Sequence, residues 1–208
     1  LKQKTTQGFP AHHFELPGPA YDALPDGWGM LLMDRLFRKR NLSPTTIGPL
    51  ERLAYVGSNA MGAMTFEPVA PQGMQTGQHF DLASLAASVQ EVLHGEGAEF
   101  LESLIQVGGS PHGARPKALV YKDPQTDAFT TIQRPGYEAW LVKFPAQSEH
   151  PEVCAIEAVY AHCLRQCGIN TPNTLHFQLP GGHSAFASKR FDRIQDVRVP
   201  MQSLASFT

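Results

Sequence analysis

The chain has 208 residues, of which 42% are hydrophobic, which is enough to form a sizeable core in one large domain or two small ones. Its formal net charge is −2 and no basic run occurs, so nothing favours direct binding of nucleic acid by this chain. No apolar run approaches the length of a membrane span and no signal-peptide pattern opens the chain, so we expect a cytoplasmic protein without membrane contact.

The first third of the chain predicts a small, mostly helical unit. Its sequence Leu24-Pro25-Asp26-Gly27-Trp28-Gly29 precedes a helical stretch that we expect from Leu31 to Arg40. Residues 71–77 are polar and contain two glycines, which is typical of a linker. We therefore divide the chain into residues 1–71 and 72–208. Immediately after the linker, Asp81 is the expected N-cap of an amphipathic helix.

A glycine-rich loop follows a helical segment expected from Glu96 to Ile105. Residues 107–117 contain three glycines, the hydroxyl of Ser110 and two cations just before an apolar run, 118–121, that predicts a strand. Glycines let backbone N–H groups approach a ligand, and cations attract negative charge, so the composition favours phosphate binding. A glycine-rich turn before a strand has the same composition, and this alternative stays open. The Walker A, dinucleotide-fold and serine-hydrolase patterns do not fit the loop.

Residues 138–144 predict a strand that is apolar on both sides of Lys143. Burying a lysine is costly unless an anionic group meets it, whereas a lysine on an edge strand can reach solvent. Both alternatives remain open at this stage.

Residues 151–167 have the apolar spacing of a helix that ends before Gly168. Glu157 lies beside the apolar stripe, and the ordinary alternative is a solvated carboxylate. Cys163 and Cys167 lie one turn apart on the stripe, so we expect buried, reduced thiols rather than a disulfide or a zinc site.

The order of these elements carries more information than any one of them. A glycine-rich loop, a strand lysine and a helix glutamate are the set with which protein kinases hold ATP. Two further strands are expected at 174–179 and 184–191, so the second unit would be an antiparallel sheet with helices. The predicted fold class is α+β, and the segment after the last strand would be the hinge that meets adenine.

The chain resembles the HipA-like serine/threonine kinases, which are the toxins of bacterial type II toxin–antitoxin pairs. The resemblance covers nearly the whole chain and implies that it is the N-terminal portion of such a kinase. The matching segments are Leu24–Gly29, Tyr55–Gly57, Met61–Ala63, Phe66–Pro68, Gly113–Lys117, Val142–Pro145, Glu157 and Lys189–Arg193. Because they are spaced along the chain in the family's order, the signal is specific.

The resemblance implies a role for each matched residue. Lys143 would bind the α- and β-phosphates of ATP, and Glu157 would position Lys143. Ser110 stands where the family carries an autophosphorylated serine, and a phosphate there would add nearly two negative charges to the loop. A turn hydroxyl is the alternative for Ser110. The residues implied around the phosphates are His112, Gly113, Ala114, Arg115, Pro116 and Lys117, and those implied at adenine by their backbone are Lys189, Arg190 and Phe191. This chain departs from the familiar pattern at Pro111, at Arg115-Pro116 and at Lys189.

The resemblance also implies what lies outside this sequence. No catalytic Asp/Asn pair and no magnesium-binding Asp follow the expected hinge before Thr208, so we expect a kinase-like N-lobe without the C-terminal helical lobe, inactive alone. The implied cofactors are ATP and Mg²⁺. The implied partners are a HipB-like helix-turn-helix antitoxin and a protein substrate such as an aminoacyl-tRNA synthetase. Two alternatives remain: a non-catalytic binding or neutralising module, and an unrelated α/β nucleotide-binding domain.

Overall fold

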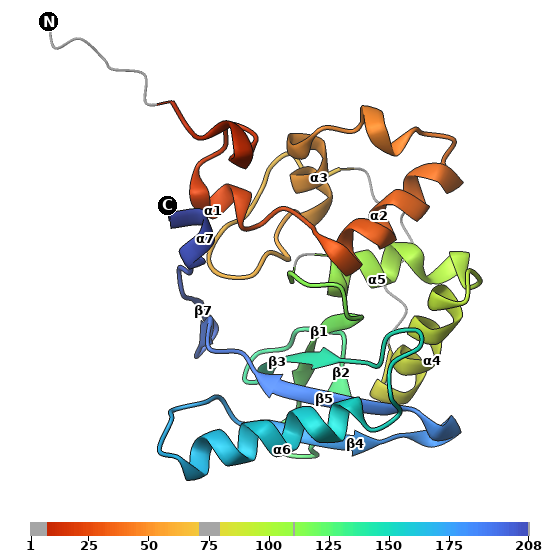
Figure 1. The fold of residues 1–208 in the computed structure, drawn as a ribbon, viewed down its shortest axis with the longest axis vertical. Helices are drawn as coiled ribbons and strands as arrows, with labels where there is room; N and C mark the ends of the chain where they lie inside the picture. Colours follow the sequence, from red (N-terminus) through yellow and green to blue (C-terminus); the bar gives the residue numbers. More distant parts are fainter. Residues whose placement is uncertain (1–7, 71–79, 110, 208) are drawn as a thin grey trace, which may run out of the picture.

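The structure, a computed structural model, describes residues 8–70, 80–109 and 111–207. It is an α+β fold in which helices come first and a sheet second (Figure 1). The predicted linker at 71–77 and Ser110 lie outside the described residues. In the three described ranges, no helix is both long and apolar enough to cross a membrane.

The regular elements among the described residues before position 70 are all helical, as the sequence predicts. They are η1 (Ala11–His13), α1 (Gly18–Tyr21), α2 (Gly27–Lys39), η2 (Pro44–Thr46) and α3 (Pro49–Val56). Helix α2 begins four residues before its expected start at Leu31, because Gly27, Trp28 and Gly29 already have helical hydrogen bonding. Its buried residues Trp28, Leu32, Met33, Leu36 and Phe37 recur at helical spacing and form one apolar face.

Asp81 is the N-cap of α4 (Leu82–Leu93), which confirms the prediction. Its Oδ1 accepts a hydrogen bond from the backbone N–H of Ser84 at 2.8 Å, and this bond holds the pKa of Asp81 below its ordinary value. The segment predicted as one helix from Glu96 to Ile105 is a short 3₁₀ turn, η3 (Ala98–Phe100), followed by α5 (Leu101–Gly108).

The sheet has five antiparallel strands in the order β2-β1-β3-β5-β4. The strands are β1 (Lys117–Lys122), β2 (Phe129–Thr130), β3 (Glu138–Lys143), β4 (Thr174–Gln178) and β5 (Ser184–Lys189), with α6 (Val153–Gln166) between β3 and β4. The strands predicted at 118–121, 138–144, 174–179 and 184–191 and the helix at 151–167 are confirmed, and β2 is an additional short strand. The chain then forms η4 (Pro180–Gly182) before β5, and the short pair β6 (Arg193–Ile194) and β7 (Val197–Arg198) before α7 (Leu204–Phe207).

The two faces of the sheet have different neighbours, because successive side chains of a strand point to opposite faces. Val120, Val142 and Ala187 join one continuous core with α2, α4 and α5. Lys143 and Phe186 point to the other face, against which α6 packs. The core therefore runs from the helical part into the sheet, while the division at residue 71 stays a prediction.

The prediction for the apolar stripe of α6 is wrong. Its large apolar residues Ile156, Val159, Tyr160 and Leu164 are exposed, and so are both expected buried thiols, Cys163 and Cys167. The helix carries a second face of small residues, and this face lies on β4 and β5. Small side chains let a helix approach a sheet closely, so the stripe of larger residues is turned outward.

Cys154 is the buried thiol of α6. It is fully buried, and its Sγ lies 3.7 Å from the carbonyl oxygen of Lys143, to which it donates. Burial raises the pKa of Cys154, so the thiol stays protonated and acts as a packing residue between α6 and β3.

Candidate phosphate-binding site

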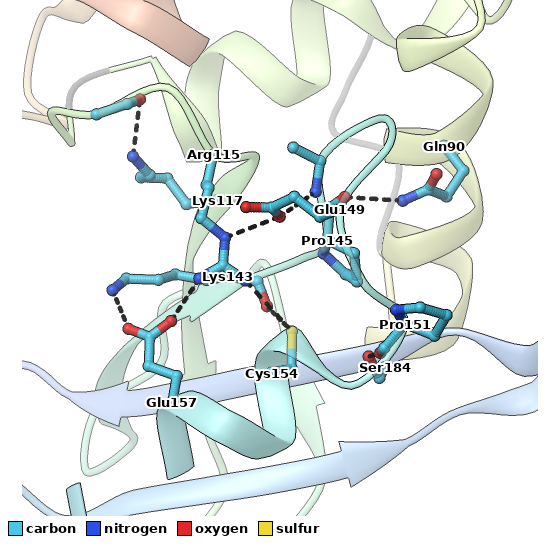
Figure 2. A network of polar contacts seen from close by, with 12 residues as sticks. Gln90, Arg115, Lys117, Lys143, Pro145, Glu149, Pro151, Cys154, Glu157 and Ser184 are labelled. Carbon is cyan, nitrogen blue, oxygen red and sulfur yellow. Dashed lines mark hydrogen bonds and ion pairs between the residues drawn. The ribbon is translucent and has the colours of Figure 1, made fainter. Parts of the chain in front are cut away.

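Lys143 lies on the middle strand of the sheet, so the alternative of an edge-strand lysine is excluded. Its Nζ forms an ion pair with a carboxylate oxygen of Glu157 on α6 (Figure 2). The same Nζ lies 5.7 Å from the ring centroid of Phe186. A lysine ammonium has three N–H donors. The ion pair therefore fixes the direction of Lys143 while leaving it able to donate to an anion.

A second lysine lies directly beside the first. Lys117 on β1 is the cross-strand partner of Lys143, and both point to the same face. Lys117 is 4% exposed, and its Nζ donates to the carbonyl oxygens of His112 (2.6 Å) and Gly113 (2.8 Å) in the glycine-rich loop. Burial lowers the pKa of Lys117 to about 8, although the nearby Asp26 carboxylate acts in the opposite direction.

Arg115 brings a third cation from the loop to the same place. It donates to Glu157 at 2.6 Å and to Glu149 at 3.1 Å. Glu157 therefore holds Lys143 with one oxygen and Arg115 with the other, which links the loop, the central strand and α6 (Figure 2). The alternative of an unpaired, solvated Glu157 is excluded by these contacts.

Glu149 is a site residue that the sequence did not reveal. It lies in the segment between β3 and α6, which is held near one end by a hydrogen bond from Gln90 to the Pro145 carbonyl (3.1 Å) and at the other by one from Ser184 to the Pro151 carbonyl (3.3 Å). No spacing or pattern around Glu149 points to Arg115, which is 34 residues away along the chain.

The glycine-rich loop also contacts the segment Leu24–Gly29, which the sequence assigned only to the N-terminal unit. The backbone N–H of Gly113 donates to Oδ1 of Asp26 at 2.7 Å, and the Gly113 carbonyl accepts from the backbone N–H of Trp28 at 3.1 Å. His112 Nε2 donates to the carbonyl of Leu24 at 2.9 Å. Within the loop, His112, Gly113 and Ala114 are exposed, whereas Pro116 and Lys117 are buried.

The expected hinge lies farther along the same sheet. Lys143 pairs with Phe186 and Trp140 with Lys189, so Lys189 lies about 10 Å from Lys143 at roughly 3.3 Å per residue. The backbone N–H groups of Lys189 and Arg190 already donate to carbonyls of the fold. Phe191 has no backbone hydrogen bond to another described residue and is 63% exposed. These three residues line an open cavity of about 580 Å³ with residues 170–173.

Residues 109–208 match the family described as the HipA-like C-terminal domain. Over these residues the chain is similar to that family. The matched part contains the loop from Gly109 onward, Lys143, Glu157 and the expected hinge, which is most of the site described above. No curated protein sequence matches the chain.

The fold of this chain is also similar to part of one chain in a solved toxin–antitoxin structure. The structure is described as the Shewanella oneidensis MR-1 toxin–antitoxin system HipA, HipB and its operator DNA complex. The TM-score is 0.51 at 17% sequence identity, and the similarity covers 89% of this chain and 41% of that chain. Our chain therefore shares a fold with less than half of the solved one, and the shared part includes helices that precede the matched family segment.

Replacing Lys117 with methionine is expected to stabilise the chain by about 2–3 kcal/mol at pH 7. The folded pKa of about 8 lies below the ordinary value of 10.5, so the folded state binds fewer protons than the unfolded state between these values. The free energy of unfolding of the wild type should therefore gain stability from Lys117 as the pH rises from 8 to 10.5. Lys117→Met should not show this gain. Urea unfolding of both proteins at pH 7 and pH 10 measures this difference. A variant no more stable than the wild type at pH 7 would contradict it.

Proposed function

We propose that this HipA-like chain is the ATP-binding part of a serine/threonine kinase, folded as a kinase-like N-lobe behind a small helical subdomain. The observation that carries the proposal is the ion pair between Lys143, on the third strand of the sheet, and Glu157, on the helix that follows. Protein kinases use a β3 lysine and a helix glutamate in this way, and both must be in place for phosphoryl transfer.

The other residues of the site support a polyphosphate ligand. Lys143 would bind the α- and β-phosphates, Glu157 would position Lys143, and Lys117 with the loop from His112 to Pro116 would surround the phosphates. The free backbone of Phe191 would meet the adenine. When bound, ATP supplies the phosphoryl group that is transferred.

Magnesium and the catalytic groups would come from the rest of the kinase. Among the described residues, no three His, Cys, Asp or Glu side chains are grouped so that they could hold a metal ion. The 41% coverage of the solved HipA chain supports a longer parent protein, with the second lobe supplying the catalytic Asp/Asn and the Mg²⁺ ligands.

We further propose that the parent kinase is a cytoplasmic toxin. It would phosphorylate a protein such as an aminoacyl-tRNA synthetase and be neutralised by a HipB-like antitoxin, as the pairing of HipA with HipB in the similar structure supports. The antitoxin, rather than this chain, would contact DNA. Autophosphorylation of Ser110 would end ATP binding by placing negative charge in the phosphate loop.

Replacing Lys143 with methionine is expected to weaken binding of a fluorescent methylanthraniloyl ATP analogue about 10- to 100-fold, because one charge-assisted contact to phosphate is lost. The matched control is Lys122→Met, since Lys122 lies on the neighbouring strand β1 and its ammonium is paired with Asp127. Fluorescence titration of the three proteins with the analogue and Mg²⁺ gives the dissociation constants.

Equal affinities of Lys143→Met and the wild type would remove Lys143 from the site. A wild-type chain that does not bind the analogue would favour the alternative function, a non-catalytic binding module. The exposed apolar face of α6, formed by Ile156, Val159, Tyr160 and Leu164, is the feature that favours this alternative.

A further inference from the structure

Two residues of the segment Leu24–Gly29 form hydrogen bonds with Gly113 of the glycine-rich loop. The N–H of Gly113 donates to the carboxylate of Asp26 (2.7 Å), and the carbonyl of Gly113 accepts from the N–H of Trp28 (3.1 Å). Because both backbone groups of Gly113 are engaged, the position and the direction of this peptide are fixed. Gly113 has a φ of +105°, a conformation that L side chains rarely adopt, so the position requires glycine.

The two chain segments approach each other so closely that side chains are excluded between them. A Cβ atom added to Gly27 would lie 2.6 Å from the carbonyl oxygen of Gly113, and one added to Gly29 would lie 2.2 Å from that of Gly109. Both glycines of Leu24–Gly29 are therefore explained by contact with the loop. The glycines of this segment therefore allow close contact with the loop, in addition to forming the start of α2.

Asp26 does not form the hydrogen bond that is usual for an aspartate at its position. It is the N-cap residue of α2, yet its side chain makes no capping hydrogen bond to the helix. An Asp at this position ordinarily accepts an N–H from the first turn, as Asp81 does for α4. Asp26 instead reaches a loop residue 87 positions away. This partner indicates that the carboxylate serves the loop.

The charge of Asp26 also acts on the site. Burial lowers the pKa of Lys117, and the Asp26 carboxylate opposes this effect, so it stabilises the charged form of the lysine. The same lysine donates to the carbonyls of His112 and Gly113. Asp26 and Lys117 therefore hold Gly113 together, one through its N–H and the other through its carbonyl.

We propose that Asp26 is a positioning residue that holds the glycine-rich loop in the conformation that receives phosphate. It acts through Gly113 and does not itself contact the nucleotide. The inference rests on the proposed function, which supplies the ligand. It also assigns the segment Leu24–Gly29 to the nucleotide site. This segment lies outside residues 109–208, which match the family.

The test compares Asp26→Ala, Asp26→Asn and the matched control Asp81→Ala, which removes an N-cap carboxylate remote from the loop. Asp26→Ala is expected to weaken binding of the methylanthraniloyl ATP analogue about tenfold, since a charge-assisted hydrogen bond that orders the loop is lost. Asp26→Asn should stay within about threefold of the wild type, because its amide oxygen can accept the same N–H. Asp81→Ala should bind as the wild type does.

A second readout does not depend on nucleotide. Amide hydrogen exchange of Gly113 should be at least about tenfold faster in Asp26→Ala than in the wild type, be restored by Asp26→Asn and be unchanged in Asp81→Ala. Unchanged exchange at Gly113, or tighter analogue binding by Asp26→Ala, would overturn the proposal. If the wild type binds no analogue but the exchange rates behave as expected, the proposed function fails while Asp26 still positions the loop.

Discussion

Replacing Asp192 with alanine is expected to destabilise the chain by about 3–5 kcal/mol. Asp192 is fully buried and accepts two hydrogen bonds from Arg190, at 2.8 and 2.6 Å, and one from Arg193 at 2.7 Å. Its Oδ2, which accepts from both arginines, also accepts the backbone N–H of Gly62 at 2.7 Å. Removing the carboxylate would leave the buried guanidinium of Arg190 without its counter-charge.

The loss would also separate distant parts of the chain. Arg193 donates to the carbonyls of Gly62 and Ala60, so the Asp192 cluster ties the segment after the expected hinge to the loop that follows α3. Urea unfolding followed by circular dichroism at pH 7 measures the change. The control is Asp196→Asn, which alters an exposed carboxylate in the nearby turn and keeps a residue that tolerates its positive φ. A loss below about 1 kcal/mol in Asp192→Ala would contradict the expectation.

The same cluster should give the stability a dependence on acid pH. Burial alone would raise the pKa of Asp192, but the hydrogen bonds and charges of the arginines hold it below the ordinary value of 3.8. Because the folded pKa is the lower one, the contribution is present above about pH 4 and is lost as the pH falls through the folded value. Asp192→Asn should lack this part of the acid dependence.

Replacing Trp28 with alanine is expected to cost about 3–5 kcal/mol, the range for truncating a buried aromatic residue. Trp28 is 1% exposed at the start of α2, and its Nε1 donates to the backbone carbonyl of Lys117 at 3.1 Å. It therefore joins the helical part to the first strand of the sheet. Trp28→Phe should cost less than the alanine variant, since it keeps most of the apolar contact and loses the hydrogen bond.

Urea unfolding of Trp28→Ala, Trp28→Phe and a surface control measures these costs. Leu50→Ala is a suitable control because Leu50 is 65% exposed on α3, and its stability should stay within about 0.5 kcal/mol of the wild type. If Trp28→Ala were no less stable than the control, the join between the helices and the sheet would not depend on this residue.

Much of the local structure and the centre of the site could be predicted from the sequence. Apolar spacing and cap residues located α4 and α6, and apolar runs located the strands around Lys143. The order of loop, Lys143 and Glu157 indicated a shared site, and the two side chains are in contact in the fold. Such features are encoded within short stretches, because periodicity and capping depend on neighbouring residues.

Other features were decided only by the tertiary structure. The contact of Asp26 with Gly113 joins residues 87 positions apart, and that of Asp192 with Gly62 joins residues 130 apart. No local pattern specifies such partners. Helix α6 illustrates the same limit, since its periodicity defined an apolar stripe but not which face would meet the sheet. Its small residues pack on β4 and β5 and its large ones, such as Tyr160, point outward, because the sequence determines the faces of a helix and the surrounding elements determine which face is buried.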